Sequence, residues 1–339
     1  MAATRTLILS AALVLIGALI GPANQAFAEV VVTYTDVAVT GAVATNVTGV
    51  NAEGVIAGYY LGGKKGTTVS GFTMNGTTTS TIAIKGATST RVNAINDSGT
   101  VVGGYVDRRG NEHGFVRTAA GTVTMLDDPD MVVTKAVRNY GTVATGINSS
   151  GVVVGYYYTT GPDKTDADIY VTHNHGFVRS GVGTFTTYDA PDAAVGGLPS
   201  VGTRLFGIND AGDMVGAYTY NVGPEIGPDT RNSGFEITVS GTFTEIVHSD
   251  PDTILNACYW TEPHGINDEG VIVGNSGNGC AGTEGGWLLS GGTFTTLAYQ
   301  TADDIGQYAL AYGINNSGVI GGSWGNGIGV RHGFTATTN

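Results

Sequence analysis

The chain has 339 residues, of which 55 are glycine, and its 15 Lys and Arg against 28 Asp and Glu give a formal net charge of −13. Charged residues make up 13% and hydrophobic residues 41%, which excludes a disordered chain, because such chains combine high charge with low hydrophobicity. The acidic balance argues against binding to a phosphate backbone, and the abundant glycine argues against long helices. We expect an all-β protein with no nucleic-acid partner.

The N-terminus has the parts of a secretory signal peptide. Arg5 is the first charged residue, an apolar run spans Leu7–Ile20, and small residues stand at Ala26 and Ala28, where signal peptidase requires them. We expect residues 1–28 to be removed and the protein to be secreted, to the periplasm or outside the cell. An uncleaved membrane anchor is the alternative, but the run is shorter than the roughly 20 residues of a membrane span. No other segment is apolar enough to cross a membrane.

The remaining residues, 29–339, contain one motif six times. The motif is Asn-x-x-Gly-x-x-x-Gly, usually preceded by Gly-Ile, and its anchor asparagines are 45 to 61 residues apart. In each copy the Asn-x-x-Gly segment separates two strand-like runs and is typical of a tight hairpin turn, capped by the asparagine side chain, with glycine at φ > 0. The anchors are Asn51, Asn96, Asn148, Asn209, Asn267 and Asn315.

Two further strand-like runs follow most of these turns. The first contains Gly-Phe, Gly-Trp or His-Gly-Phe, and the second contains Gly-Thr-Phe-Thr or a variant of it. Four short antiparallel strands in a repeat of roughly 50 residues are typical of a β-propeller blade. The sequence therefore predicts a single domain that is a six-bladed β-propeller of four-stranded antiparallel blades. A straight solenoid of the same repeats is the alternative.

The two ends of the chain favour a closed ring. The sixth repeat stops at Asn339, after its third strand, whereas residues 30–37 precede the first repeat and belong to no hairpin. Their pattern resembles the fourth strand of the third repeat, at Thr184–Asp189. We expect this N-terminal strand to complete the last blade, because that exchange would remove an exposed sheet edge.

The repeated runs also resemble a known family. Gly-Ile-Asn-Asp-x-Gly-x-x-Val-Gly, His-Gly-Phe and Gly-Thr-Phe-Thr-Thr are similar to the HAF-type extracellular repeat of secreted bacterial proteins, over nearly all of residues 29–339. The chain departs from the triplet that names the family, because His113, His175 and His332 are followed by Gly rather than Ala. The resemblance implies an exported bacterial protein with propeller-like repeats, and it implies no activity. Because the three histidines share one repeat position, we interpret them as structural.

The connections between strands differ between the two faces of such a ring. One face has only tight turns, whereas the other has long, irregular connections such as Thr159–Asn174 and Tyr220–Asn232. Long loops on a rigid scaffold often carry binding sites, so we expect the ligand on this long-loop face. Cys258 and Cys280 both fall on it. Since secretion permits disulfides, we expect the two to be bridged; two buried free thiols are the alternative.

Aromatic residues supply one set of candidate ligand contacts. Tyr or Trp recurs two positions after the last glycine of the motif in five of six repeats, and this regularity favours packing between sheets. Trp324 belongs to that set and is retained among the candidate ligand-binding residues. Tyr158, Tyr220 and Trp260 break the repeat and are the better candidates, because a flat ring with a polar atom suits a sugar or a peptide.

Polar residues supply a second set. Arg91, Arg204 and Glu262 share the position five residues before their anchors, and we expect them to approach a central channel. Glycosidase chemistry needs two convergent carboxylates, which sequence proximity does not assemble, so no catalytic residue is assigned. Acidic stretches such as Asp127–Asp130 and Asp189–Asp192 lack EF-hand spacing and are interpreted as turns rather than calcium sites. We therefore expect no metal and no cofactor.

These features predict an exported, non-enzymatic binding or scaffold protein that presents its long-loop face to a glycan or to a cell-surface or extracellular protein. The net negative charge favours a neutral ligand over a polyanion. One alternative is a structural surface repeat protein without a small ligand. The other is a hydrolase or lyase that acts on a glycan at the mouth of the channel.

Overall fold

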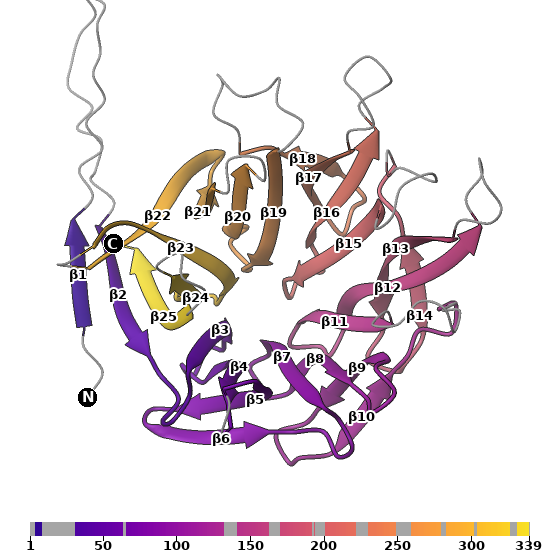
Figure 1. Ribbon diagram of the computed structural model, residues 1–339. Coiled ribbons are helices and arrows are strands. Elements are labelled where there is room, and N and C mark those ends of the chain that lie inside the picture. The colour runs from indigo at the N-terminus through magenta and orange to yellow at the C-terminus, as the bar shows by residue number, and fades with distance from the viewer. Residues whose placement is uncertain are drawn as a thin grey trace, which may run out of the picture.

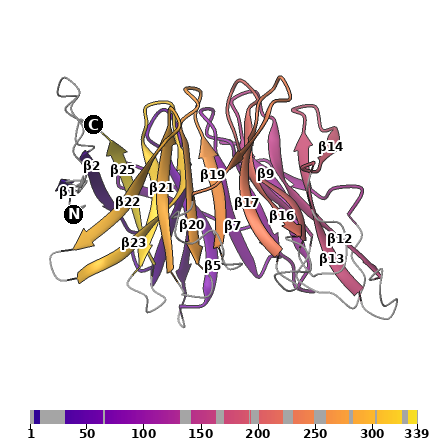
Figure 2. The ribbon, with the colours of Figure 1, turned by 90° about the horizontal axis from the view of Figure 1, so that it is seen from above.

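The computed structural model describes residues 4–8, 31–63, 66–131, 141–162, 170–191, 193, 201–221, 230–248, 259–278, 283–301, 304–325 and 331–338. Every regular element among them is a β-strand, so the all-β prediction is confirmed. This part of the chain contains no helix that is long and apolar enough to span a membrane. Figure 1 shows the six repeats following one another around a common centre, and Figure 2 shows their strands running between two opposite faces.

The strands follow the sequence repeats in order, and in each repeat the first strand leads to the anchor asparagine. Two strands precede the repeats: β1 (Thr4–Ile8) and β2 (Val31–Val37). The first repeat has β3 (Ala44–Val50), β4 (Ile56–Gly62), β5 (Thr68–Asn75) and β6 (Thr78–Ile82). The second has β7 (Ser89–Ile95), β8 (Val101–Val106), β9 (Glu112–Arg117) and β10 (Val123–Leu126). The third has β11 (Thr142–Ile147), β12 (Val153–Pro162), β13 (Tyr170–Arg179) and β14 (Phe185–Tyr188).

The other three repeats continue the series. The fourth has β15 (Val201–Ile208), β16 (Met214–Asn221), β17 (Thr230–Ile237) and β18 (Phe243–Ile246). The fifth has β19 (Tyr259–Ile266), β20 (Ile272–Asn278), β21 (Thr283–Ser290) and β22 (Thr293–Thr301). The sixth has β23 (Asp304–Ile314), β24 (Ile320–Gly325) and β25 (Arg331–Thr338).

Hydrogen bonding joins these strands into one mixed sheet of 17 strands and two sheets of four. The first two repeats form the four-stranded sheets, whereas the other repeats are joined together. The links are short parallel pairings between β13 and β15 and between β17 and β19, and an antiparallel pairing of β22 with β23. The predicted six-bladed β-propeller of four-stranded blades is therefore wrong, because from the third repeat onward backbone pairing continues from one repeat into the next and joins these repeats into one sheet.

The N-terminal strand β2 pairs antiparallel with β25, from Val32 opposite Thr338 to Val37 opposite Gly333. The predicted pairing of this strand with the last repeat is thus confirmed. Val32 and Tyr34 are buried, and the Tyr34 ring meets that of Phe334 edge-on, with centroids 5.1 Å apart. On its other edge β2 pairs with β1, which lies within the predicted signal peptide.

The asparagine and the first glycine of the repeat motif form a tight turn, and the second glycine lets a neighbouring strand and an aromatic ring pack closely against the backbone. In the third repeat, Asn148 Oδ1 accepts a hydrogen bond from the Val152 amide at 3.0 Å, and Gly151 closes the turn at φ +76°. An L side chain rarely adopts that conformation, which accounts for the first glycine. At Gly155, a Cβ atom would meet the Val143 carbonyl oxygen and the Phe177 ring, which accounts for the second.

The core is divided among six clusters of buried side chains, most of them shared by neighbouring repeats. The aromatic residue that follows glycine in each third strand is fully buried; these residues are Phe72, Phe115, Phe177, Phe235, Trp287 and Phe334. Because neighbouring repeats share most of the clusters, a repeat depends on its neighbour for a complete core.

The buried anchor asparagines form a closed ring of hydrogen bonds. Each donates from its side-chain Nδ2 to the backbone oxygen of the next anchor, at 3.0–3.4 Å. The series ends where Asn315 donates to Asn51, at 3.0 Å, so the last repeat is tied to the first. The first strand of each repeat is called its inner strand; these are β3, β7, β11, β15, β19 and β23. The asparagine ring holds the six inner strands around one centre.

Candidate functional site

A β-bulge interrupts the inner strand of every repeat three residues before its anchor. In the third repeat the pairing of β11 with β12 shifts register between Ala144 and Gly146, and the same shift occurs in the other five. A bulge of this kind re-aims the extra side chain. The residues at this position line the space at the centre of the molecule and are called the bulge ring: Thr48, Asn93, Thr145, Phe206, His264 and Tyr312.

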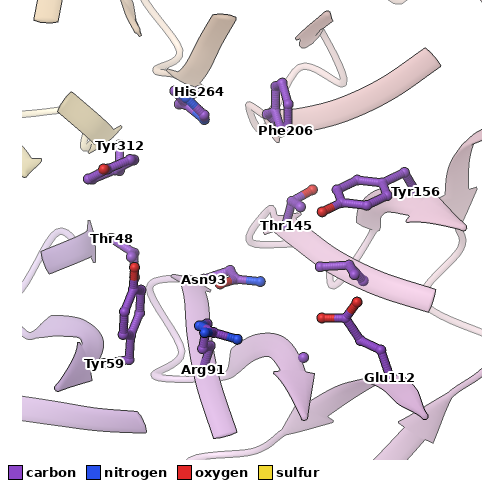
Figure 3. A pocket seen from close by; sticks show the side chains of 12 residues that line it. Thr48, Tyr59, Arg91, Asn93, Glu112, Thr145, Tyr156, Phe206, His264 and Tyr312 are labelled. Carbon is purple, nitrogen blue, oxygen red and sulfur yellow. The ribbon is translucent and has the colours of Figure 1, made fainter. Parts of the chain in front are cut away.

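The bulge ring lines a cavity of about 300 Å³, the central pocket, shown in Figure 3. Its volume is at the lower end of the roughly 300–1,000 Å³ of small-molecule sites. The other lining residues are Tyr59, Arg91, Gly104, Glu112, Val143 and Tyr156. Two narrower spaces of about 70 Å³ each are lined by the same inner strands, and the second reaches the anchor asparagines. The widest part is therefore on the side away from the tight anchor turns.

Half of the bulge ring is polar and ties consecutive repeats together. Thr48 Oγ1 donates to the Val92 carbonyl at 3.0 Å. Asn93 Nδ2 donates to Ala144 at 2.8 Å, and Thr145 Oγ1 donates to Leu205 at 2.8 Å. These bonds fix the three side chains in place, so the polar half of the pocket wall is preorganised.

The other half of the bulge ring is aromatic. The rings of Phe206 and His264 are 4.8 Å apart, and those of His264 and Tyr312 are 5.4 Å apart, measured between centroids. Tyr156 packs edge-on against Phe206, with centroids 6.4 Å apart. Tyr59 and Tyr156 stand on opposite sides of the cavity in Figure 3. Flat apolar surface therefore faces polar side chains across one small space.

Burial sets the protonation of the ionisable groups in the pocket. It lowers the pKa of His264 to about 4, so the imidazole is neutral at pH 7. It raises the pKa of Tyr312 to about 12 and also raises that of Tyr156, so both phenols keep their protons. Burial raises the pKa of the Glu112 carboxyl too, and the nearby Arg91 charge only partly opposes this. Arg91 is the fixed cation of the lining.

An ion pair lies beside the aromatic half of the pocket. Arg204 Nη2 donates to Glu262 Oε1 at 2.7 Å, and the Arg204 guanidinium lies over the Phe206 ring, 5.3 Å from its centroid. Burial acts to raise the pKa of Glu262, but Arg204 and His264 outweigh it, and the pKa lies below its ordinary value. Glu262 is thus an ionised partner of Arg204 and is poorly suited to act as a general acid.

The structure brings some of the sequence-predicted site residues together. Arg91 lines the pocket, and Arg204 and Glu262 pair at its edge. Tyr158 lies next to this group, with its ring 5.7 Å from that of Tyr156 and nearly perpendicular to it. Of these four residues Arg91 lines the central pocket and the other three lie beside its lining, and binding by them stays a prediction.

The other predicted contacts lie elsewhere. Trp324 stacks on His332 with centroids 4.3 Å apart and packs against the core of the last repeat. Trp260 is near the start of β19, across the ladder from Gly277. Tyr220 belongs to β16, but its side chain is outside the described part of the structure. Cys258 and Cys280 are also outside the described residues, so their bridge stays a prediction.

The repeated histidines contact residues of their own repeats, and their structural role stays a prediction. His113 stacks on Tyr105 and its Nδ1 lies 2.9 Å from an Asp127 oxygen. His175 stacks on Tyr157, and its Nδ1 lies 3.0 Å from Asp189. These contacts bind adjacent strands of one repeat. No group of three or more metal-ligating residues is found among the described side chains.

The expected long loop at Thr159–Asn174 is largely a hairpin. β12 and β13 remain paired from Thr159 opposite His173 to Pro162 opposite Tyr170. The connection at Tyr220–Asn232 is likewise shortened, because β16 extends to Asn221 and β17 begins at Thr230. The candidate site is the central pocket, which lies among the first strands of the repeats.

Sequence reasoning missed the bulge ring, Tyr59, Tyr156 and Glu112. A signal for the bulge ring was present in the sequence. Each anchor asparagine is preceded by Gly-Ile or a close variant, and the residue directly before that pair differs widely between repeats. It is Thr, Asn, Thr, Phe, His and Tyr in the six repeats. A position that varies within an otherwise constant repeat motif holds a side chain that the repeat fold itself does not require.

Comparison with known proteins adds no assignment to this geometry. No protein-family model matches the chain, and no curated protein matches it. The resemblance to HAF-type repeats therefore stays a prediction.

Proposed function

We propose that this protein is an exported, non-enzymatic binding protein that holds a small glycan in the central pocket. The carrying observation is the pairing of an aromatic wall with a polar wall in one cavity of about 300 Å³. A sugar presents apolar C–H faces and a rim of hydroxyl groups, so it needs both kinds of wall. Export is proposed from the signal-peptide pattern of residues 1–28.

The charges of the pocket support binding rather than hydrolysis. A glycosidase needs two carboxyl groups flanking the scissile bond. Among the described residues that line the pocket, Glu112 is the only carboxylic acid, and the nearby Glu262 is bound by Arg204 at 2.7 Å. The site therefore offers one acid of raised pKa and no free second carboxylate beside it.

Two adjacent tyrosines on β4 provide a matched test. Tyr59 lines the central pocket, whereas Tyr60 points to the other face of the strand and packs against Phe72, with centroids 6.3 Å apart. The secreted protein is screened against an array of oligosaccharides, and the best ligand is titrated by calorimetry into the variants Tyr59→Ala and Tyr60→Ala.

The proposal predicts that Tyr59→Ala weakens binding by about 1 kcal/mol or more, roughly fivefold, and that Tyr60→Ala leaves the affinity unchanged. Equal losses in the two variants would place the site elsewhere. Release of shortened saccharides that is abolished in Glu112→Gln would replace the binding function by an enzymatic one.

A further inference from the structure

Two arginines occupy the same repeat position but differ in their surroundings. Arg204 is paired with Glu262, and its side chain is about three-quarters buried. Arg91 is exposed to the cavity, and no carboxylate of the described residues lies within ion-pair distance of it. Its guanidinium lies over the Tyr59 ring, 5.6 Å from the centroid. The pocket thus presents one cation whose hydrogen-bonding edge is available.

One carboxylic acid lines the central pocket together with Arg91, and burial acts against its charged form. Glu112 lines the same cavity, on the same side as Arg91 in Figure 3 and across from His264 and Phe206. Because burial raises the pKa of Glu112, its neutral form is favoured relative to a carboxylate in water. Three further ionisable groups of the lining, His264, Tyr156 and Tyr312, are uncharged at pH 7.

We propose that the ligand of the central pocket is an acidic sugar of the hexuronate class, whose carboxylate binds the guanidinium of Arg91. This inference rests on the proposed function. The planar guanidinium of arginine matches a carboxylate through two parallel N–H···O bonds, which an ammonium group cannot form. The aromatic wall accepts the sugar ring, and Thr48, Asn93 and Thr145 face its hydroxyl groups. The net charge of the chain, −13, would repel an acidic sugar. Preference for such a sugar therefore has to come from the local positive charge of Arg91.

The test compares sugars that differ only in the carboxylate. D-glucuronate and D-glucose, and D-galacturonate and D-galactose, are titrated as monosaccharides and as disaccharides into the purified full-length protein at pH 7. We expect each acidic sugar to bind at least tenfold more tightly than its neutral partner. Arg91→Gln should remove that preference, and Arg91→Lys should retain only part of it. Glu112→Gln should keep the preference or strengthen it, because the change removes a possible like charge.

Arg117→Gln is the matched control. Arg117 ends β9 in the same four-stranded sheet, opposite Val101, and lies outside the central pocket. It removes the same unit of charge, so a loss shared by Arg117→Gln and Arg91→Gln would reflect the net charge of the protein and overturn the inference.

The outcomes separate the inference from the proposed function. If acidic and neutral sugars bind equally and Tyr59→Ala weakens both, the glycan-binding function stands and the acidic ligand is refuted. If acidic sugars bind preferentially but Arg91→Gln has no effect, the assignment of Arg91 is wrong. If no saccharide of any class binds in the array or in solution, the proposed function fails together with the inference.

Discussion

The bulge ring lies on the six inner strands and the asparagine ring directly follows those strands, three residues further along the chain, but the two rings differ in composition. Every member of the asparagine ring is identical and donates to the next. The bulge ring has Thr twice and four other residue types once each. Both rings face the centre and are fixed by the same backbone. The difference indicates that every position of the first ring has the same structural role, whereas the second ring joins repeats through Thr48, Asn93 and Thr145 and has room for ligand contacts in its aromatic half.

The largest expected effect comes from breaking the closure that both rings depend on. Deletion of residues 31–37 removes the strand paired with β25 and the buried side chains of Val32 and Tyr34. We expect unfolding to become easier by about 5 kcal/mol or more, because two large side chains lose their burial and a sheet edge is exposed. Thermal unfolding by calorimetry checks this, and an unchanged, cooperative transition would refute the role of β2.

The next effect concerns the asparagine ring alone. In Asn148→Leu the volume is kept, but the Asn209 carbonyl and the Val152 amide both lose a partner. We expect a loss of about 1–3 kcal/mol in denaturant unfolding, since the Val152 amide loses its side-chain partner and the Asn209 carbonyl keeps only the hydrogen bond from the Gly212 amide. The neighbouring exposed change Ser149→Ala should stay within about 0.5 kcal/mol of the wild type. Equal stability of the two variants would contradict the structural role of the ring.

An intermediate effect is expected at His264, where burial in the bulge ring holds the pKa at about 4, below its ordinary value of 6.5. Between these values the unfolded state binds a proton that the folded state does not. Stability therefore falls as pH drops from about 6.5 to 4, by at most about 3 kcal/mol from this residue.

The variant His264→Phe should flatten the pH dependence in that interval. Denaturant unfolding measured at pH 7, 5.5 and 4.5 makes the comparison, and parallel curves for His264→Phe and the wild type would show that His264 is not the buried neutral group described.

The smallest effect on stability should accompany a clear effect on binding. Phe206→Leu in the bulge ring keeps an apolar side chain, so we expect a loss of only about 1 kcal/mol in stability. It removes a flat ring from the pocket, and saccharide affinity should fall about fivefold. Phe243→Leu, in the outer strand β18, should alter stability similarly without altering affinity. A bulge-ring variant that loses stability but keeps full affinity would erase the distinction between the rings.

Several parts of the fold could be predicted because they are local. Each Asn-x-x-Gly turn and each close glycine is determined by residues within one repeat, as Asn148 and Gly155 illustrate. The pairing of β2 with β25 could also be predicted, because β2 precedes the first repeat and belongs to no hairpin, whereas the last repeat lacks a fourth strand. The division into separate blades was wrong, because the pairing of β22 with β23 depends on how two repeats meet rather than on the pattern of either.

The site was predictable only in part, for a related reason. Position within the repeat was enough to bring Arg91, Arg204 and Glu262 toward the centre. The bulge was not foreseen, since a bulge is defined by the partner strand, and it is the bulge that turns Phe206 or Tyr312 into the cavity. The aromatic residues that repeat most regularly, such as Tyr105, proved to be packing residues.

The most direct test of this account is a crystal structure of the protein with the saccharide that titration shows to bind best. The account predicts density for the saccharide in the central pocket, against the ring of Tyr59 or Phe206, with an acidic group on the Arg91 guanidinium. Density for the saccharide on the outer loops, with the central pocket holding none of it, would contradict the account.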